Sequence, residues 1–474
     1  MHRSVIKRTV LTTYNFSNIR YAQPPIDDLR FRAPVPVTGN SSGINTGSVG
    51  SICPQPVSLF TNAAMAQWIV AYVQGTILDF NELEQQLGNS TSPATPSDTR
   101  VTEDCLFLDV VVPQTILDNR GQGIQAPVLV WIHGGGYIVG EKGGFGRYNP
   151  SGIIQASRAA GDDGFVFVSI SYRLGAFGFL AGSAVQQDGT LNAGLLDQRL
   201  ALEWVQQNIH LFGGSPDRVT VMGESAGGGS ILNQLTAYGG SRGPVPFQQI
   251  IPQSAGNQPA ASPQSFEDSA QIFMSAANVS SIKELRRVPL KELTVANTEA
   301  IAAQRLMSYG PSVDGSFVPG DVSRMLATGS FDQTVTALIG MNSHEGTLFA
   351  DPRVNSSVSY SEYIRDTIPG ISEASARHIE DVLYPPIFDG SYGYRNHFER
   401  GVITFQELAF TCNAPMLSWA MGNHTNNYIF AAEPGLHAQD VPYTFYNGAE
   451  TGVGGITAAP TTPSENTGQG QEYR

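Results

Sequence analysis

The segment Arg218–Gly227, RVTVMGESAG, decides the fold, because it is typical of a strand that turns sharply into a helix. RVTVM is predicted to be a buried strand, and an apolar, helix-like stretch follows the segment. Glycines stand two positions before and two after Ser225, where side chains would collide with neighbouring backbone in such a strained turn. The turn lifts the serine hydroxyl clear of the sheet, and the helix N-terminus favours negative charge that develops there. The pattern predicts that Ser225 is a nucleophile. A chance match in a glycine-rich loop is the alternative, which the flanking strand and helix disfavour.

Other strand-like runs alternate with helical patterns along the chain. Fully apolar runs separated by helices indicate a mostly parallel sheet with both faces covered. No boundary interrupts this alternation, so we predict one α/β domain over residues 1–447. It would carry a helical insertion over 262–326 and a Gly/Thr/Pro-rich, mobile tail over 448–474. The expected strands are Ala126–His133, Gly164–Ser171, Arg218–Met222, Gln249–Pro252, Thr336–Gly340 and Asn427–Ala431, with an amphipathic helix over Asn192–Leu211.

The composition excludes several function classes. Of the 474 residues, 41% are hydrophobic, which is enough for a large buried core and excludes disorder across the chain. The formal net charge is −14, which disfavours nucleic acid and an anionic membrane surface as partners. No apolar run approaches about 18 residues, so no transmembrane helix is expected.

The cysteines and glycosylation sequons bear on the cellular compartment. Cys53, Cys105 and Cys412 are compatible with one disulfide and one free thiol. The start, MHRSVIKRTVLTTYNF, lacks the continuous apolar stretch of a signal peptide. The glycosylation sequons nevertheless favour passage through a secretory pathway. We therefore expect a secreted glycoprotein, although the N-terminal segment does not have the pattern of a signal peptide. The sequons begin at Asn15, Asn40, Asn89, Asn278, Asn355 and Asn423.

Ser225 needs a base to remove its proton, and that base needs a carboxylate to orient it. In this kind of fold the chain order is serine, acid, histidine. His437 follows a predicted strand and lies in a loop bounded by glycine and proline, EPGLHAQDVPY. Glu345 lies at the end of the strand TALIG, where such sheets place reactive groups. We predict that both are partners of Ser225; without the serine motif, Glu345 would be interpreted as an exposed loop acid. The other downstream histidines are His344, His378, His397 and His424.

A triple glycine, Gly134–Gly136, follows the predicted strand VLVWIH. Backbone N–H groups of such a run can point at one oxygen with no side chain in the way, so we predict an oxyanion hole. A phosphate or dinucleotide loop is excluded, because no G-K-[ST] follows and the glycines do not open a helix. The second glycine cluster, GEKGGFGRYNP, fails in the same way and is assigned to a loop near the mouth of the site. No cofactor or metal is expected.

These motifs and their order resemble the type-B carboxylesterase/lipase family, the α/β-hydrolases that include cholinesterases and fungal lipases. The resemblance runs from about Asn18 to Tyr446, and its central block alone identifies the family. The matching stretches are NIRYAQPPIDDLRFRAP, EDCLFLDVVVP, VLVWIHGGGY, VSISYRLGAFGFL, LNAGLLDQRLALEWVQQNIHLFGGSPDRVTVMGESAGG, VDGSFVPG, ALIGMNSHEGTLF and GLHAQDVPYTF.

The resemblance implies a role for each matching residue of the site. Ser225 would be the nucleophile, His437 the general base and acid, and Glu345 the orienting acid. Glu224 matches an acid that lies behind the nucleophile in the family. The oxyanion hole would be formed by the backbone N–H groups of Gly135, Gly136 and Ala226.

The resemblance also implies a disulfide between Cys53 and Cys105, with Cys412 free and buried. In the family lipases the loop closed by this disulfide is a lid, and here residues 53–105 hold the apolar AMAQWIVAYV. Two interpretations stay open: these apolar side chains cover the site and respond to lipid, or, as we favour, they pack permanently against its rim. The side chains are Trp68, Ile69, Tyr72 and Val73, and two scaffold ion pairs of the family correspond to Arg30–Glu103 and Arg173–Asp197.

The activity implied is hydrolysis of a carboxylic ester or lipid ester through an acyl-enzyme. The alternatives are a non-catalytic adhesion or binding module of the same fold, and an acyltransferase or thioesterase of secondary metabolism. Activity is expected to fall as the pH drops through about 6–7, because a protonated imidazole cannot act as a base. The chain departs from the family pattern at both ends, since members begin with an N-terminal hairpin and continue well beyond the histidine. Nothing in the sequence indicates an oligomeric state.

Overall fold

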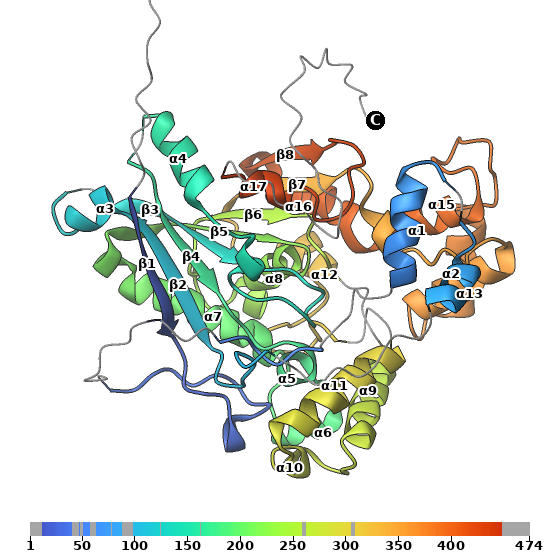
Figure 1. Ribbon diagram of the computed structural model, residues 1–474, viewed down its shortest axis with the longest axis horizontal. Coiled ribbons are helices and arrows are strands. Elements are labelled where there is room, and N and C mark those ends of the chain that lie inside the picture. Colours follow the sequence, from blue (N-terminus) through green and yellow to red (C-terminus); the bar gives the residue numbers. More distant parts are fainter. Residues whose placement is uncertain are drawn as a thin grey trace, which may run out of the picture.

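A twisted, mostly parallel sheet forms the centre of the molecule (Figure 1). The computed structural model describes residues 12–39, 47, 51–56, 63–76, 78–87, 98–123, 125–161, 163–257, 262–304 and 309–447. Within these residues the sheet has eight strands in the order β1-β2-β4-β3-β5-β6-β7-β8. The strands are β1 (Thr13–Arg20), β2 (Phe107–Pro113), β3 (Ala126–Ile132), β4 (Val166–Ile170), β5 (Gly214–Glu224), β6 (Gln249–Gln253), β7 (Thr336–Asn342) and β8 (Thr425–Phe430).

The predicted fold class, an α/β-hydrolase with a mostly parallel sheet, is confirmed. From β4 to β8 all neighbouring strands are parallel, and each predicted strand is present. β1 and β2 are the addition: β1 pairs antiparallel with β2, and β2 antiparallel with β4. Sequence patterning did not predict these two strands, because β1 is mostly exposed and β2 alternates buried with half-buried positions instead of forming one continuous apolar run. β1 is an edge strand with mostly exposed or half-buried residues.

Both faces of the sheet are covered, because alternate side chains of each central strand point to opposite sides. On one face, Val128, Val130 and Ile132 of β3 join the main core with α7 (Ala193–Asn208) and α8 (Ala226–Leu235). On the other face, Trp131 belongs to a cluster with α4 (Ser151–Ala159) and α17 (Val441–Thr444). The central strands are therefore packed between helices on both faces, and this packing fixes the positions of their carboxyl ends.

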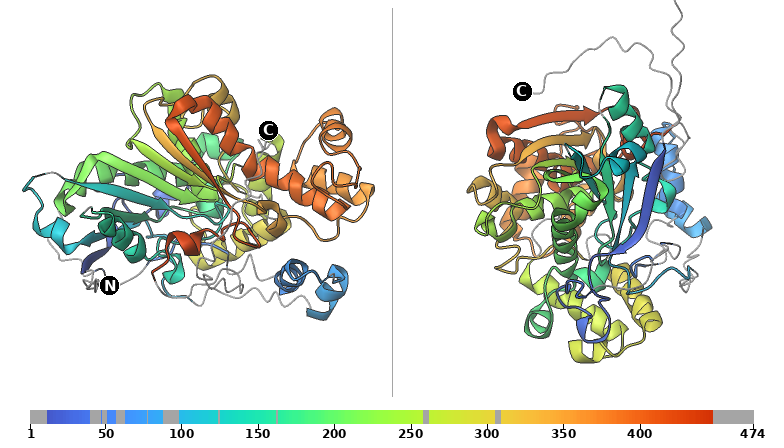
Figure 2. Two further views of the ribbon diagram at one scale, coloured as in Figure 1. Left: turned by 90° about the horizontal axis from the view of Figure 1, so that it is seen from above. Right: turned by 90° about the vertical axis from the view of Figure 1, so that its left-hand side faces the viewer.

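Two groups of helices lie beyond the sheet (Figures 1 and 2). The predicted helical insertion contains α9–α12, of which α9 packs on α11 and α10 on α6. A second helical region, α13–α15, follows β7, whereas α16 packs against β7 and β8 at the sheet. Among the described helices none is both long and apolar enough to cross a bilayer. The remaining helices are α1 (Ala63–Val73), α2 (Phe80–Leu87), α3 (Gln114–Asp118), α5 (Gly175–Phe179), α6 (Ser183–Asp188), α9 (Pro263–Ala276), α10 (Ile282–Leu285), α11 (Leu290–Gln304), α12 (Val322–Ala327), α13 (Ser357–Thr367), α14 (Glu373–His378), α15 (His397–Gln406) and α16 (Asn413–Met421).

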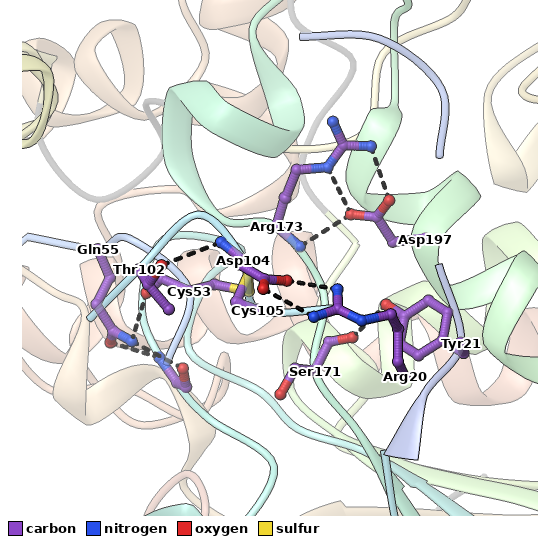
Figure 3. Close-up of a disulfide and its surroundings, with 11 residues drawn as sticks. Arg20, Tyr21, Cys53, Gln55, Thr102, Asp104, Cys105, Ser171, Arg173 and Asp197 are labelled. Carbon is purple, nitrogen blue, oxygen red and sulfur yellow. Dashed lines mark hydrogen bonds and ion pairs between the residues drawn. A yellow bond between two sulfur atoms is a disulfide. The ribbon is translucent and has the colours of Figure 1, made fainter. Parts of the chain in front are cut away.

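The predicted disulfide between Cys53 and Cys105 is present, and both cysteines are buried (Figure 3). Nearby, Arg173 donates two hydrogen bonds from its guanidinium to the buried carboxylate of Asp197, at 2.8 and 2.7 Å. Cys412 is free as expected, but the expectation that it is buried is wrong. It follows the π-helical turn η7 (Glu407–Thr411) and caps α16, which leaves its side chain at the surface.

The second predicted scaffold pair is also formed. Arg30 binds the carboxylate of Glu103 with two hydrogen bonds of 2.6 Å, and both side chains are buried. The same guanidinium donates to the carbonyl oxygens of Leu285, Arg286 and Val288. This pair therefore attaches the helical insertion to the N-terminal part of the chain.

Helix α1, the apolar part of the predicted lid loop, packs against α15 in this structure (Figure 1). Trp68 stacks on Tyr72 with ring centroids 5.0 Å apart and meets Phe398 edge-on at 4.7 Å. The same cluster includes Leu436, the neighbour of His437. Trp68 and Ile69 are buried, Tyr72 is half-buried and Val73 is 36% exposed, so both interpretations of this loop stay predictions. The predicted tail, 448–474, lies outside the described residues.

Candidate active site

Ser225 occupies a strained turn between β5 and α8. Its φ of 59° and ψ of −122° lie in a region that residues with side chains rarely adopt. A Cβ at Gly223 would lie 2.7 Å from the carbonyl oxygen of Ile132, and one at Gly227 only 2.1 Å from the same oxygen. The two glycines of the motif are therefore required by backbone packing against β3, as the sequence pattern predicted.

The three predicted side chains meet at the carboxyl ends of β5, β7 and β8. The hydroxyl of Ser225 lies 2.8 Å from Nε2 of His437, and Nδ1 of His437 lies 2.6 Å from Oε2 of Glu345. A carboxylate can only accept, so the proton of the neutral imidazole is on Nδ1, and Nε2 is free to accept the serine proton. Glu345 is fully buried, while Ser225 is 9% and His437 5% exposed.

The loop that carries His437 is fixed by its own hydrogen bonds. The side chain of Gln439 accepts from the backbone N–H of Leu436 at 2.9 Å and donates to the carbonyl oxygens of Ala432 and Glu433. His344 N–H donates to the carbonyl oxygen of Gly435 at 2.8 Å, which ties this loop to the one that carries Glu345. The position of the imidazole is therefore fixed by bonds within its own loop and by the bond to the loop that carries Glu345.

Glu224 is the second carboxylate that faces the imidazole. Its Oε1 lies 3.2 Å from Nε2 of His437, and both side chains are buried. Burial raises the pKa of Glu224, and the charge of His437 lowers it by a smaller amount. Burial acts to lower the pKa of His437, but the carboxylates of Glu224 and Glu345 outweigh it and raise that pKa above its ordinary value. The acid limb of activity is accordingly expected above the pH range of about 6–7 that the sequence suggested.

The predicted oxyanion donors are available. Gly134 lies directly against the serine turn, since a Cβ there would be 3.0 Å from the Cβ of Ser225. Gly135 and Gly136 have φ values of +111° and +61°, which turn the chain away from the end of β3. Among the described hydrogen bonds, none uses the backbone N–H of Gly135, Gly136 or Ala226 as donor. The oxyanion hole formed by these three N–H groups therefore stays a prediction.

An aromatic cluster beside His437 was not predicted. The ring of Phe410 lies 4.3 Å from the imidazole, and that of Phe349 meets it edge-on at 5.0 Å. Phe349 stacks on Phe405 at 5.0 Å. These rings exclude water from one side of the imidazole. The sequence could have indicated Phe349, because it follows Glu345 by only four residues. It holds no such indication for Phe410, which comes from a helix far away in the chain.

The remaining sequence candidates lie apart from this constellation. His344 is exposed, and its Nδ1 lies 2.9 Å from its neighbour Ser343 Oγ. In the loop GEKGGFGRYNP, the charge of Arg147 opposes the rise in the pKa of Glu224 that burial causes. Its Lys142 is buried and paired with Asp109 at 3.1 Å. No group of residues suited to holding a metal ion occurs in the described part of the chain.

The serine turn and its hydrogen-bonded histidine and acid, at the ends of neighbouring parallel strands, define an α/β-hydrolase with serine-hydrolase geometry. A model of the carboxylesterase family matches residues 3–384. Carboxylesterase patB of Penicillium expansum is 40% identical over 450 residues, covering 92% of this chain and 79% of that protein. Secreted lipase 1 of Botryotinia fuckeliana is 33% identical over 353 residues, covering 72% of this chain and 57% of the lipase.

Among solved structures, Aspergillus niger EstA is similar with a TM-score of 0.72 and 28% sequence identity, over 94% of this chain and 80% of that one. The chain belongs to the carboxylesterase family, as its motifs predicted, and is a carboxylic ester hydrolase. The disulfide and a secreted relative are consistent with an extracellular protein.

Proposed function

We propose that the protein cleaves carboxylic esters through an acyl-enzyme formed on Ser225. The observation that carries this is the continuous chain of short hydrogen bonds from Ser225 Oγ through His437 to Glu345, at 2.8 and 2.6 Å. His437 Nε2 takes the serine proton as Oγ attacks the ester carbonyl, and Glu345 stabilises the imidazolium that results. The imidazolium then protonates the departing alcohol. Water, deprotonated by the same nitrogen, cleaves the acyl-enzyme.

The negative oxygen of each tetrahedral intermediate would be held by the backbone N–H groups of Gly135, Gly136 and Ala226. Ala226 is the first residue of α8, so the positive end of the helix dipole supports the same charge. Such donors act on the charge that develops only in the transition state, which is why they accelerate the reaction.

The direct test is labelling with a fluorophosphonate probe, followed by mass spectrometry, beside turnover of p-nitrophenyl acetate. Ser225→Ala is expected to abolish both labelling and turnover while the circular-dichroism spectrum is unchanged. Ser230→Ala is the matched control, since Ser230 is also buried in α8, where its hydroxyl accepts from the side-chain amide of Gln198 and not from His437. Turnover retained by Ser225→Ala, or no labelling of the wild type, would refute the nucleophile.

We further propose that the protein is a secreted glycoprotein acting on small-molecule or lipid esters. Three of its sequons lie at exposed positions in the described residues: Asn15, Asn278 and Asn355. Treatment with an N-glycanase, followed by intact-mass measurement of protein from a fungal host, tests the first part. A series of p-nitrophenyl esters from acetate to palmitate, with and without micelles, tests the second. A mass that N-glycanase leaves unchanged would contradict the proposed glycosylation. Failure to cleave both short and long esters would contradict the proposed substrate class.

A further inference from the structure

Asp440 is a buried carboxylate three residues after His437, in the same loop. It is 3% exposed. Its Oδ1 accepts from the side-chain amide of Asn342 at 3.2 Å, and its Oδ2 accepts from that of Gln253 at 3.1 Å. Buried charges are costly unless they are paired or hydrogen-bonded, and here two amide N–H groups converge on one carboxylate.

The two partners of Asp440 are the residues that hold the other reacting side chains. Asn342 ends β7, and its backbone N–H donates to Oε1 of Glu345 at 2.6 Å. Gln253 ends β6, and its backbone carbonyl accepts from the N–H of Ser225 at 3.0 Å. Asp440 itself belongs to the loop that carries His437. One carboxylate thus joins the supports of all three residues across the ends of adjacent strands (Figure 1).

Resting on the proposed function, we propose that Asp440 is a positioning residue of the active site, which fixes Ser225 and Glu345 relative to His437 through Gln253 and Asn342. A displacement of about 1 Å between reacting groups can cost about 100-fold in rate, so a device that sets their spacing has kinetic consequences. Asp440 is hydrogen-bonded to no reacting atom: it acts through its two partners and, as a charge, on His437.

The charges around Asp440 give the proposal a second signature. Glu345 and Glu224 lie on one side of it, His437 on another, and the hydroxyl of Tyr428 faces it from β8 through Gln253. Burial raises the pKa of Asp440, with Glu345 adding to this and the amide of Asn342 opposing it. The negative charge of Asp440 in turn helps to raise the pKa of His437, after the larger effects of burial and the two glutamates. Removal of that charge therefore lowers the pKa of His437.

Two variants of Asp440 separate positioning from charge. Asp440→Ala removes both acceptors, and we expect kcat to fall by about 10- to 100-fold with KM nearly unchanged. Asp440→Asn keeps the shape and can re-form both bonds if the amide of Asn342 rotates, so it is expected to recover most of kcat. Because Asp440→Asn lacks the charge, the acid limb of its kcat/KM profile is expected to move to lower pH.

The matched control is Asp332→Asn. Asp332 is a buried carboxylate that accepts from the backbone N–H of Val245 and Thr334, at the amino ends of β6 and β7, opposite the site. It is expected to lose folding stability without a change in kcat or in the pH profile. All rates are divided by the fraction of enzyme that a fluorophosphonate titrates.

The proposal is overturned if folded Asp440→Ala keeps kcat within twofold of the wild type, or if Asp440→Asn has an unmoved acid limb. Should Asp440→Ala not fold, the pH profile of Asp440→Asn alone decides. Activity retained by Ser225→Ala would instead overturn the proposed function, so the two failures are distinguishable.

Discussion

Oε1 of Glu224 lies 3.2 Å from Nε2 of His437, the same nitrogen that faces the hydroxyl of Ser225. In the described chain this carboxylate oxygen is buried and has no hydrogen-bond donor. It is placed to accept from Nε2 when that nitrogen is protonated, which is the state that follows nucleophilic attack. Glu224 is therefore placed to favour the imidazolium, and it does so at the expense of the neutral base.

The first prediction follows from that charge. Glu224→Gln removes one of the three carboxylates that raise the pKa of His437, so the neutral base persists to lower pH. The acid limb of kcat/KM is expected to move to lower pH, measured with p-nitrophenyl acetate in buffers of constant ionic strength. Glu433→Gln, an exposed acid in the same loop as His437, should leave the limb in place. A limb that stays fixed in Glu224→Gln would contradict the electrostatic role.

The second prediction concerns the orienting acid. Glu345→Gln keeps the size of the side chain but can present an amide N–H to Nδ1 of His437, which favours the wrong tautomer. We expect kcat to fall by about 10³- to 10⁴-fold with the fold intact. Single-turnover measurement of acylation checks it. A loss of less than about tenfold would show that another group orients the imidazole.

The third prediction concerns the oxyanion donors. A Cβ at Gly135 would lie 2.0 Å from the carbonyl oxygen of Val139, so Gly135→Ala must displace the loop that carries the donors. We expect kcat to fall by about 10²- to 10³-fold. Gly123→Ala is the control for backbone strain, because its φ of +107° is close to the +111° of Gly135 while its Cβ would meet nothing within 4 Å. Equal losses in both variants would argue against the oxyanion hole.

The fourth prediction concerns stability. The Cys53–Cys105 disulfide joins residues 52 positions apart, and loop-closure entropy gives such a link about 4 kcal/mol. The double variant Cys53→Ser, Cys105→Ser is expected to lose roughly that free energy of unfolding in urea titration. Cys412→Ser, which alters only an exposed free thiol, should unfold at the wild-type midpoint. Unfolding of the double variant at that same midpoint would show that the loop is held by packing alone.

The sequence predicted the features that depend on local spacing. Gly223 and Gly227 stand at a fixed spacing around Ser225, although the carbonyl oxygen that keeps them free of a Cβ belongs to Ile132 of β3. The runs that form the central strands are long enough to identify in the sequence. The order of motifs then selected Glu345 and His437 among several acids and histidines. These are properties of short segments, which explains why they could be found without coordinates.

What sequence could not supply depends on contacts between distant segments. Phe410 lies beside His437 because it belongs to the π-helical turn η7, which the hydrogen bond from Asn257 N–H to the carbonyl oxygen of Ala409 ties to the segment after β6. The sequence did not predict a role for Asp440, because its hydrogen-bond partners, Asn342 and Gln253, are far away in the chain. The exposure of Cys412 is likewise set by how η7 joins α16, and no periodic pattern encodes it.

The position of β8 has a consequence for heat tolerance. In the described sheet this strand pairs only with β7, yet the loop after it carries His437. If β8 separated from β7, His437 would leave the active site while the interior of the molecule was still folded. Activity should therefore be lost at a lower temperature than the cooperative unfolding of the whole protein. Mutations meant to raise the temperature at which activity is lost would be placed where Tyr428 of β8 packs on Gly340 of β7, not in the core.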